Sequence, residues 1–443
     1  MPSTRMMLEQ RWTSQSRRSY LVGIALLLAS LAAVAVSLKT TRTWLQLTSP
    51  VIITLCVLWW LRFLYLWQRK ASFARREGRR KEHPAERLDI PAGVKKPEQY
   101  DGGQTLHEAQ WTYIDRAVEA QGSYFASGIV AAILPPLALF LLSFQLLALP
   151  AGGSWAIGLI LGEMSCLVIL VYLALTSHEP TAEWIENRLR TELFRREQYL
   201  FLAGVGPYLF QKPLEATKEA LRRRGQIEGA DAHTLVGLVP MQERSGLTWL
   251  EALHHRGSAK LPSRSDFIER MESYLYYRIG KQLVWFANEI RDIQEAEQMW
   301  ARLLAGTLLA AIGIAAVHAF HLYGAHAAGG AGDAAGYSGV TTGTLAIVLP
   351  PLGAACLSIR AIYNFRGRSR IYEHERGLLH THRGALEALI QEARQLPTGA
   401  TARDADKIDF DFRAIALRTE HSLSVELDQW MLLMERREHE VSP

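Results

Sequence analysis

The chain has 443 residues, of which 49 are Lys or Arg and 44 are Asp or Glu, so its formal net charge is only +5. Its mean hydropathy of +0.00 averages long apolar runs and charged segments and describes neither. This balance gives no reason to expect direct nucleic-acid binding. The three cysteines, Cys56, Cys166 and Cys356, all fall within apolar runs, so neither a disulfide framework nor a cysteine-based metal site is expected.

Six apolar runs of about 20 residues are arranged in three pairs, and each pair is joined by a connector with few charges. An α-helix of about that length crosses the hydrocarbon core of a bilayer. The sequence therefore predicts an all-α integral membrane protein with six transmembrane helices in three hairpins. In chain order the predicted spans are Tyr20–Leu38, Pro50–Trp67, Ala126–Leu147, Trp155–Leu175, Ala301–Leu322 and Thr342–Ile362.

Basic residues distinguish the two sides of the predicted membrane. Connector 39–49 holds two of them and connectors 148–154 and 323–341 hold none, whereas a dense basic cluster follows the second span between Arg69 and Lys81. Lys and Arg accumulate on the cytoplasmic side. We therefore expect the N- and C-termini and both long segments between hairpins to be cytoplasmic.

Apolar residues at helical spacing predict that the hairpins continue inward as helical stalks. No Pro or Gly separates Lys281 from Ala305, so that helix should run directly into the fifth span. Further helices are predicted from Glu179–Pro180 onward, over Ala361–Gln395 and over about Phe412–Glu438. The clearest stripe consists of Leu275, Ile279, Leu283, Phe286, Ile290 and Ile293.

These features divide the chain into four parts. Residues 1–98 form an N-terminal hairpin with a basic juxtamembrane segment, 99–210 and 266–443 are hairpins with flanking helices, and 211–265 are a cytoplasmic insert or linker. Glycine and proline break the last segment into short pieces, and its histidines lack metal-ligand spacing. The carboxylates at 404, 406, 409 and 411 have neither the central glycine nor the final Glu of a calcium loop, so we interpret them as a solvated linker.

No motif predicts an enzyme. The sequence has no phosphate-binding GxxxxGK[ST], no GxGxxG after a strand, no HExxH and no GxSxG. We therefore expect no catalytic, cofactor-binding or metal-binding residues.

The most informative polar residue is Glu163, eight residues into the fourth predicted span. A carboxylate at that depth tends to face a cavity, to pair with a base or to stay protonated. Arg62 in the second span is its candidate partner by depth. Two interpretations stay open, a helix-packing acid and a pore-lining or gating residue. Gly158 and Gly162 precede it as a GxxxG pair that permits close helix packing.

The third and sixth spans share the pattern GxxAxxLPPLxxxxLS, as GIVAAILPPLALFLLS (128–143) and GTLAIVLPPLGAACLS (343–358). The proline pairs, Pro135 with Pro136 and Pro350 with Pro351, remove backbone donors and should bend each helix. The two spans cross in opposite directions, which is also what a three-plus-three inverted repeat of a transporter would show.

Two regions resemble the SLATT-type two-transmembrane domains of bacterial conflict and anti-phage systems. The first, about 104–210, contains QWTYIDRAVEAQ before its hairpin and AEWIENRLRTELFRREQYLFLAGVGPY after it. The second, about 268–437, contains YYRIGKQLVWFANEIRDIQEAEQMW, then LPPLGAACLSIRAIYNFRGRSRIYEHERGLL, then EHSLSVELDQWMLLM. The match lies in pattern and arrangement, without a catalytic motif, so no site residue is carried over from the family.

The resemblance implies a multi-pass effector in the bacterial inner membrane that is triggered through its cytoplasmic helices and permeabilises the membrane or forms a pore. It also implies a cytoplasmic defence protein or a nucleotide-signal system as a partner. Besides the lipid bilayer, we expect a second copy of this chain as a partner, because spans and stalks present much helical surface. The alternatives are a secondary transporter or channel with inverted-repeat spans, and a membrane scaffold that localises a cytoplasmic defence partner.

Overall fold

The computed structural model describes residues 90–91, 93–100, 103–148, 155–176, 178–208, 212–238, 264–327, 334–397 and 402–441, and these contain helices and short connections without a strand. They fall into two compact units. The hairpin unit comprises 122–179 and 298–363. The stalk unit comprises the described residues before 122 together with 180–297 and those from 364 onward.

The first hairpin of the hairpin unit pairs α3 (Gly103–Ala148) with α4 (Trp155–Thr176). Its core joins Val130, Leu134, Ala138 and Leu141 of α3 with Leu159 and Cys166 of α4. The helices approach closely at Gly162, where an added Cβ would lie 3.3 Å from Leu141 Cδ1. Apolar side chains and a glycine at the contact are what packing within a bilayer requires.

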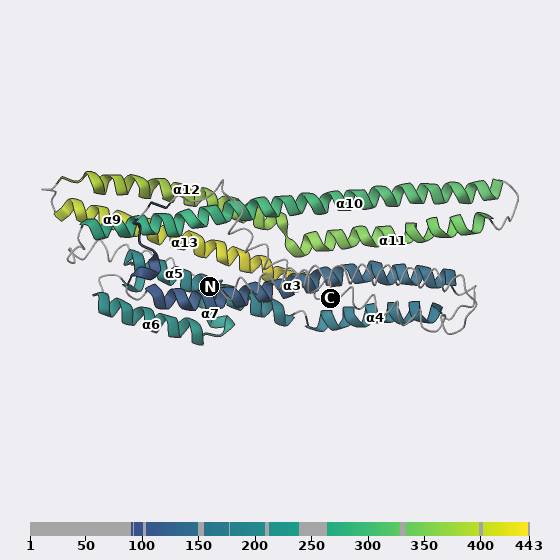
Figure 1. Ribbon diagram of the computed structural model, residues 1–443, viewed down its shortest axis with the longest axis horizontal. Helices are drawn as coiled ribbons and strands as arrows, with labels where there is room; N and C mark the ends of the chain where they lie inside the picture. The colour runs from purple at the N-terminus through teal and green to yellow at the C-terminus, as the bar shows by residue number, and fades with distance from the viewer. Residues whose placement is uncertain are drawn as a thin grey trace, which may run out of the picture. The chain divides into compact units, whose positions relative to one another are not determined.

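The second hairpin pairs α10 (Lys281–Ala327) with α11 (Ala334–Tyr363), and the two helices run side by side (Figure 1). At Gly353 of α11, an added Cβ would lie 3.4 Å from Leu308 and 3.7 Å from Leu304 of α10. The opposite side of α10 is apolar and open, since Leu309 and Phe320 are 70% and 77% exposed. Such a surface suits lipid or another helix, but not water.

Three helical stretches are long and apolar enough to cross a membrane: Gly103–Ser143, Ser265–Phe320 and Ala346–Gln395. A shorter apolar helix covers Leu159–Leu175. These stretches overlap most of the third, fifth, sixth and fourth predicted spans, respectively. The first two predicted spans, Tyr20–Leu38 and Pro50–Trp67, lie outside the described residues, so six spans and their orientation remain predictions.

The stalk unit is a bundle of helices, with α12 packed along α13, α9 and the π-helix η5. Its elements are η2 (Pro97–Gln99), α5 (His178–Ala203), η4 (Gly206–Tyr208), α6 (Pro213–Gly229), α7 (Ala232–Leu238), α9 (Arg264–Ser273), η5 (Tyr274–Gly280), α12 (Phe365–Gln395) and α13 (Ala402–Val441). All six residues of the stripe predicted from Leu275 to Ile293 are buried, and α10 runs from the stalk into the fifth span as predicted.

The acidic segment before the last helix was predicted to be a solvated linker, and that prediction was wrong. The helix begins at Ala402, so the four carboxylates lie within its first turns. Acidic side chains near a helix N-terminus interact favourably with the helix dipole. Asp409 also forms an ion pair with Arg413, one turn further along, at 2.9 Å.

Within the described residues, the segment that follows α5 is a folded insert. Helix α6 continues through Gly225, where the sequence predicted a break. Two arginines of α5 connect the insert to the bundle: Arg190 donates to the carbonyl of Ala230 and Arg196 to that of Leu238, at 2.8 and 2.9 Å. Residues 239–263 lie outside the described residues, as do His254 and His255.

Helices α11 and α12 are separated by a single residue, Asn364, which adopts a left-handed conformation with φ 43°. Its side-chain oxygen accepts a hydrogen bond from the Gly367 amide at 3.2 Å. A Cβ at Gly367 would lie 2.7 Å from the end of that side chain, so a larger residue there would have to displace the Asn364 cap. The sequence predicted one helix from Ala361 to Gln395, and the break at 364 corrects that.

The two hairpins of the hairpin unit meet where α3 passes the end of α11. Gly128 faces Ile362, whose Cδ1 and Cγ2 atoms would lie 3.1 and 3.2 Å from an added Cβ. One turn before, the rings of Phe125 and Tyr363 stack with centroids 4.2 Å apart and an interplanar angle of 3°. This contact brings together residues more than 200 positions apart in the chain.

Gly128→Val should therefore overpack the contact and lower the free energy of unfolding by about 1–3 kcal/mol, measured by thermal melting of the detergent-solubilised protein. The matched control is Gly313→Val, because nothing lies within 4 Å of a Cβ at that membrane-helix glycine. The control should change stability by less than about 0.5 kcal/mol. Equal effects of the two substitutions would contradict the close contact.

Candidate functional site

The stalk unit contains a seven-residue π-helix, η5, directly before α10. In a π-helix the backbone bonds connect residues i and i+5, and such turns are rare and often lie at functional sites. The amide of Lys281 donates to the carbonyl of Tyr276 in this pattern. Every residue of η5 except Tyr276 is buried, so this segment forms the centre of the bundle.

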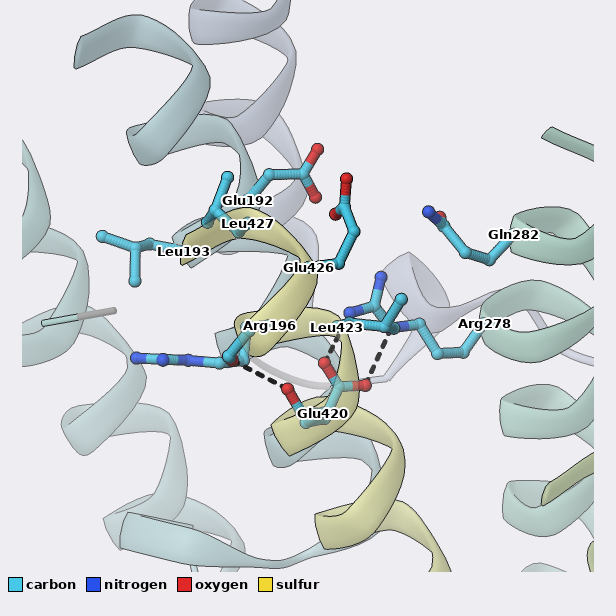
Figure 2. Close-up of a pocket in the computed structure, with 10 residues that line it drawn as sticks. Glu192, Leu193, Arg196, Arg278, Gln282, Glu420, Leu423, Glu426 and Leu427 are labelled. Atoms are coloured by element: carbon cyan, nitrogen blue, oxygen red, sulfur yellow. Dashed lines mark hydrogen bonds and ion pairs between the residues drawn. The ribbon is translucent and has the colours of Figure 1, made fainter. Parts of the chain in front are cut away.

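A buried ion pair connects η5 with α13. The guanidinium of Arg278 donates to both carboxylate oxygens of Glu420, at 2.8 Å from Nε and 2.5 Å from the terminal nitrogen (Figure 2). The hydroxyl of Tyr274 donates to the same carboxylate at 2.8 Å. Arg278 is 4% exposed and Glu420 is fully buried. Burial opposes the charge on Arg278, but Glu420 outweighs it and raises the pKa of the guanidinium.

Helix α5 contacts the π-helix from another side. The hydroxyl of Tyr199 donates to the backbone carbonyl of Tyr277 at 2.8 Å, and the Arg278 guanidinium lies 5.0 Å from the Tyr199 ring centroid. A carbonyl within a π-turn is displaced from the usual i+4 amide, and the Tyr199 hydroxyl supplies this one with a hydrogen-bond donor. Burial raises the pKa of Tyr199, so the hydroxyl keeps its proton and donates.

Helices α5 and α13 also pack through a second buried group of charges. Trp430 is buried edge-to-face against Trp184, with centroids 5.1 Å apart, and Arg188 lies 4.7 Å from the Trp430 ring centroid. Arg188 also lies 3.9 Å from the Glu426 carboxyl. That distance is too long for a hydrogen bond, and Glu426 Oε1 has no hydrogen-bond partner among the described residues.

Glu426 carries a strongly perturbed carboxyl. Burial raises its pKa from the ordinary 4.5 to about 7, and the neighbouring carboxylates Glu192 and Glu375 add to the effect, whereas Arg188 opposes it. Arg188 itself remains charged, because Tyr372 and the surrounding carboxylates raise its pKa despite burial. Glu426 therefore exchanges its proton near neutral pH, where an exposed carboxyl is fully ionised.

Arg278 and Glu420 of the first group and Glu426 of the second line one small cavity of about 20 Å³, large enough for an ordered water molecule but not for a metabolite. Figure 2 shows the Glu192 and Glu426 carboxyls close together at one side, with Gln282 opposite and the Arg278–Glu420 pair below. Among the described residues, no group of three or more His, Cys, Asp or Glu side chains is placed to hold a metal ion. The geometry suits holding helices together through charge.

Glu163, in the fourth predicted span, accepts a hydrogen bond from Gln145 Nε2 at 2.7 Å, across the first hairpin. Gln145 is buried at 6% exposure. A neutral amide from the neighbouring helix therefore contacts the carboxyl that we expected to pair with Arg62. Arg62 lies outside the described residues, so that pairing is still a prediction.

The other residues selected from the sequence do not converge on a site. Pro135 and Pro136 lie within the continuous helix α3, and Pro350 and Pro351 lie within α11. Gly162 makes the close contact with Leu141, while the surroundings of Gly158 are not described. The buried charges of the stalk were missed. The available signal was a charged residue within an apolar helix face, as at Arg278 beside Ile279 or Glu420 between Leu417 and Leu423.

None of the family models, curated proteins or solved structures that were compared with this chain matches it. The resemblance to SLATT-type domains therefore rests on the sequence patterns quoted above.

Removing one partner of the central ion pair should be costly. Glu420→Ala leaves the buried Arg278 guanidinium without its carboxylate and should lower the free energy of unfolding by about 3–5 kcal/mol, measured by denaturant unfolding in detergent. The matched control is Glu387→Ala, which breaks a half-exposed ion pair with Arg383 and should cost less than about 1 kcal/mol. Similar losses in the two variants would show that the buried pair is not structurally important.

The raised pKa of Glu426 predicts a pH dependence with a defined sign. Below about pH 4.5 the carboxyl is protonated in the folded and the unfolded chain, and its contribution to stability is complete. As the pH rises through about 7, the unfolded chain releases the proton first, so stability falls by roughly 3 kcal/mol.

Glu426→Gln removes this titration, so its melting temperature should exceed that of the natural chain at pH 8 and should vary less between pH 5 and 8. The matched control is Asp428→Asn, which removes a carboxylate from an exposed position of the same helix and should leave the pH profile unchanged. A Glu426→Gln protein that kept the pH profile of the natural chain would show that another group titrates.

The Glu163–Gln145 hydrogen bond predicts a difference between two substitutions. Glu163→Gln keeps an oxygen acceptor for Gln145 and should change the free energy of unfolding by no more than about 1 kcal/mol. Glu163→Leu leaves the buried Gln145 amide without this acceptor and should cost about 1–3 kcal/mol. Melting of the detergent-solubilised variants measures both, and equal stability of the two would contradict a structural role for the bond.

Proposed function

We propose that this chain is a bacterial inner-membrane effector of an anti-phage defence system, triggered through its cytoplasmic helices and acting by membrane permeabilisation or pore formation. The observation that carries the proposal is the continuity of α10. One unbroken helical stretch, Ser265–Phe320, connects the buried charge network of the stalk with an apolar span. A change in stalk packing therefore has a direct route to a membrane helix.

The apolar surface of the hairpins supports assembly of several copies. In α10 and α4, residues Ile312, Val168 and Leu175 are between 64% and 76% exposed, so one copy leaves much of its span surface for lipid or for another copy. Glu163 and Gln145 are the polar side chains that a pore could use. The partners that we propose are the bilayer, further copies of the chain and a cytoplasmic defence protein or nucleotide-signal system.

A secondary transporter or channel is the second candidate, and one observation favours it. A carboxyl that is hydrogen-bonded to a side-chain amide within a membrane hairpin, as Glu163 is to Gln145, is a common feature of substrate or ion paths. The shared proline-pair pattern of α3 and α11 is consistent with an inverted repeat. A scaffold that only localises a partner is the third candidate.

Membrane potential distinguishes these candidates. Bacteria that express the full chain with its neighbouring genes are infected with phage, and a potential-sensitive dye is followed in single cells. Collapse of the potential before lysis is expected for an effector, and Glu163→Gln should alter it if this carboxyl lines the conducting path. Growth arrest at full potential would contradict permeabilisation and favour the scaffold. If the potential collapses in the Glu163→Gln variant as it does in the natural chain, Glu163 does not line the conducting path.

A further inference from the structure

The pair formed by Arg188 of α5 and Glu426 of α13 is less complete than three neighbouring pairs of the stalk unit. Those three have hydrogen-bond distances: Arg278 with Glu420, Arg368 with Glu289, and Arg195 with Glu192. The closest charged atoms of Arg188 and Glu426 are 3.9 Å apart, although both side chains are largely buried, at 12% and 5% exposure. Arg188 Nε and Glu426 Oε1 are also without a hydrogen-bond partner within the part of the chain that the structure describes. A movement that closed this gap would therefore be favourable whenever Glu426 is ionised.

Arg188 lies between two groups of α13 that are one helical turn apart. Its guanidinium carbon is 4.7 Å from the Trp430 ring centroid, and its terminal nitrogen is 3.9 Å from the Glu426 carboxyl. A buried aromatic face attracts a cation, and a neutral carboxyl competes with it only weakly. An ionised carboxylate competes strongly, because a charge-assisted hydrogen bond is about twice as strong as a neutral one. The protonation of Glu426 therefore decides which of the two groups holds Arg188.

We propose that Glu426 is a proton sensor of the stalk unit that moves Arg188 between the Trp430 ring and its own carboxylate. With Glu426 protonated, Arg188 stays over the ring at the distance given above. When Glu426 releases its proton, the guanidinium closes the gap and donates a hydrogen bond to the carboxylate. The proton leaves through the small cavity that Glu426 and Glu192 line, which has room for a water molecule and reaches solvent where Glu192 is 21% exposed.

Groups from every element around Glu426 determine the pH at which it titrates. They are Arg188, Glu192, Arg195 and Arg196 from α5, Glu375 from α12, Arg278 from η5, Gln282 from α10, and Glu420 from α13 itself. Burial opposes ionisation most strongly, Glu192 and Glu375 add to it, and Arg188 and Arg195 favour ionisation, so the pKa of Glu426 is raised to about 7. Figure 2 shows the Glu192 and Glu426 carboxyls close together. A change of one pH unit near neutrality therefore changes the ratio of the two forms of Glu426 about tenfold.

This inference goes beyond the proposed function, because it concerns how α5 and α13 hold together and requires no pore. The Trp430 ring packs edge-to-face on Trp184 of α5, so a guanidinium that leaves the ring alters a contact between these two helices. Loss of the effector function would leave the proton sensor in place, and absence of the sensor would leave the effector proposal unchanged.

Fluorine NMR of the full chain, labelled with 5-fluorotryptophan and solubilised in detergent, measures the surroundings of Trp430. The chain has 12 tryptophans, and Trp430→Phe identifies the signal of this one. Between about pH 5 and about pH 9 we expect that signal to shift along one titration curve with its midpoint near pH 7, the pKa of the Glu426 carboxyl. A Trp430 signal that stays constant over this range would overturn the proposal.

Glu426→Gln tests the proton site itself. Glutamine does not ionise, so the Trp430 signal should lose its titration and stay at its low-pH position. The matched control is Asp428→Asn, which removes an exposed carboxylate of the same helix and should keep the curve. Glu375→Gln should keep the transition at a lower midpoint, because it removes a carboxylate that raises the pKa of Glu426. A transition that persisted in Glu426→Gln would mean that another group titrates and would overturn the proposal.

Two substitutions of Arg188 separate movement of the guanidinium from the electric field of the carboxylate alone. Arg188→Gln removes the cation, so most of the amplitude of the shift should be lost, and the midpoint should rise by about one to three pH units because a base that favours ionisation is gone. Arg188→Lys keeps the charge and should keep the midpoint within about one pH unit. Its ammonium group cannot lie flat on the ring, so the amplitude should fall here too.

The signals of the other tryptophans report whether each variant keeps its fold. Full amplitude in a folded Arg188 variant would show that the Trp430 ring senses only the charge on Glu426, and this result would overturn the movement of Arg188.

Discussion

The bidentate contact between Arg278 and Glu420 organises the stalk unit. Taking two charges out of water costs several kcal/mol each, and their attraction often only offsets that cost. The pair therefore adds little net stability compared with two apolar side chains. What it does add is specificity, because a forked guanidinium can meet a carboxylate in one register only. Tyr274 contacts the same carboxylate, so η5 and α13 can align in one way.

A helix with a π-turn at its centre is consistent with this constraint. Tyr274 and Arg278 reach one carboxylate, while Tyr199 reaches the carbonyl of Tyr277 between them. These contacts come from α13 and α5, which also pack on each other through Trp184, Arg188 and Trp430. The stalk interior thus contains both aromatic rings and charged side chains. Each charged side chain lies on a helix face that is otherwise apolar.

Much of this architecture could be predicted from periodicity, and the central contacts could not. The stripe from Leu275 to Ile293 was confirmed because spacing alone reports which face of a helix is buried. Periodicity does not report pairing across 142 residues, which is the separation of Arg278 and Glu420. It also does not distinguish π- from α-helix over seven residues. The acidic residues before position 412 were misassigned because composition was weighed above two local effects that favour a helix: Asp404 lies in its first turn, and Asp409 pairs with Arg413.

The single residue between α11 and α12 has a mechanical consequence. Helix α10 continues from the stalk into the second hairpin without a break, whereas α11 ends before α12 begins. At Asn364 the helical hydrogen-bond pattern is interrupted by a left-handed residue. The second hairpin is therefore joined to the stalk by one continuous helix, α10, and by one interrupted connection, at Asn364.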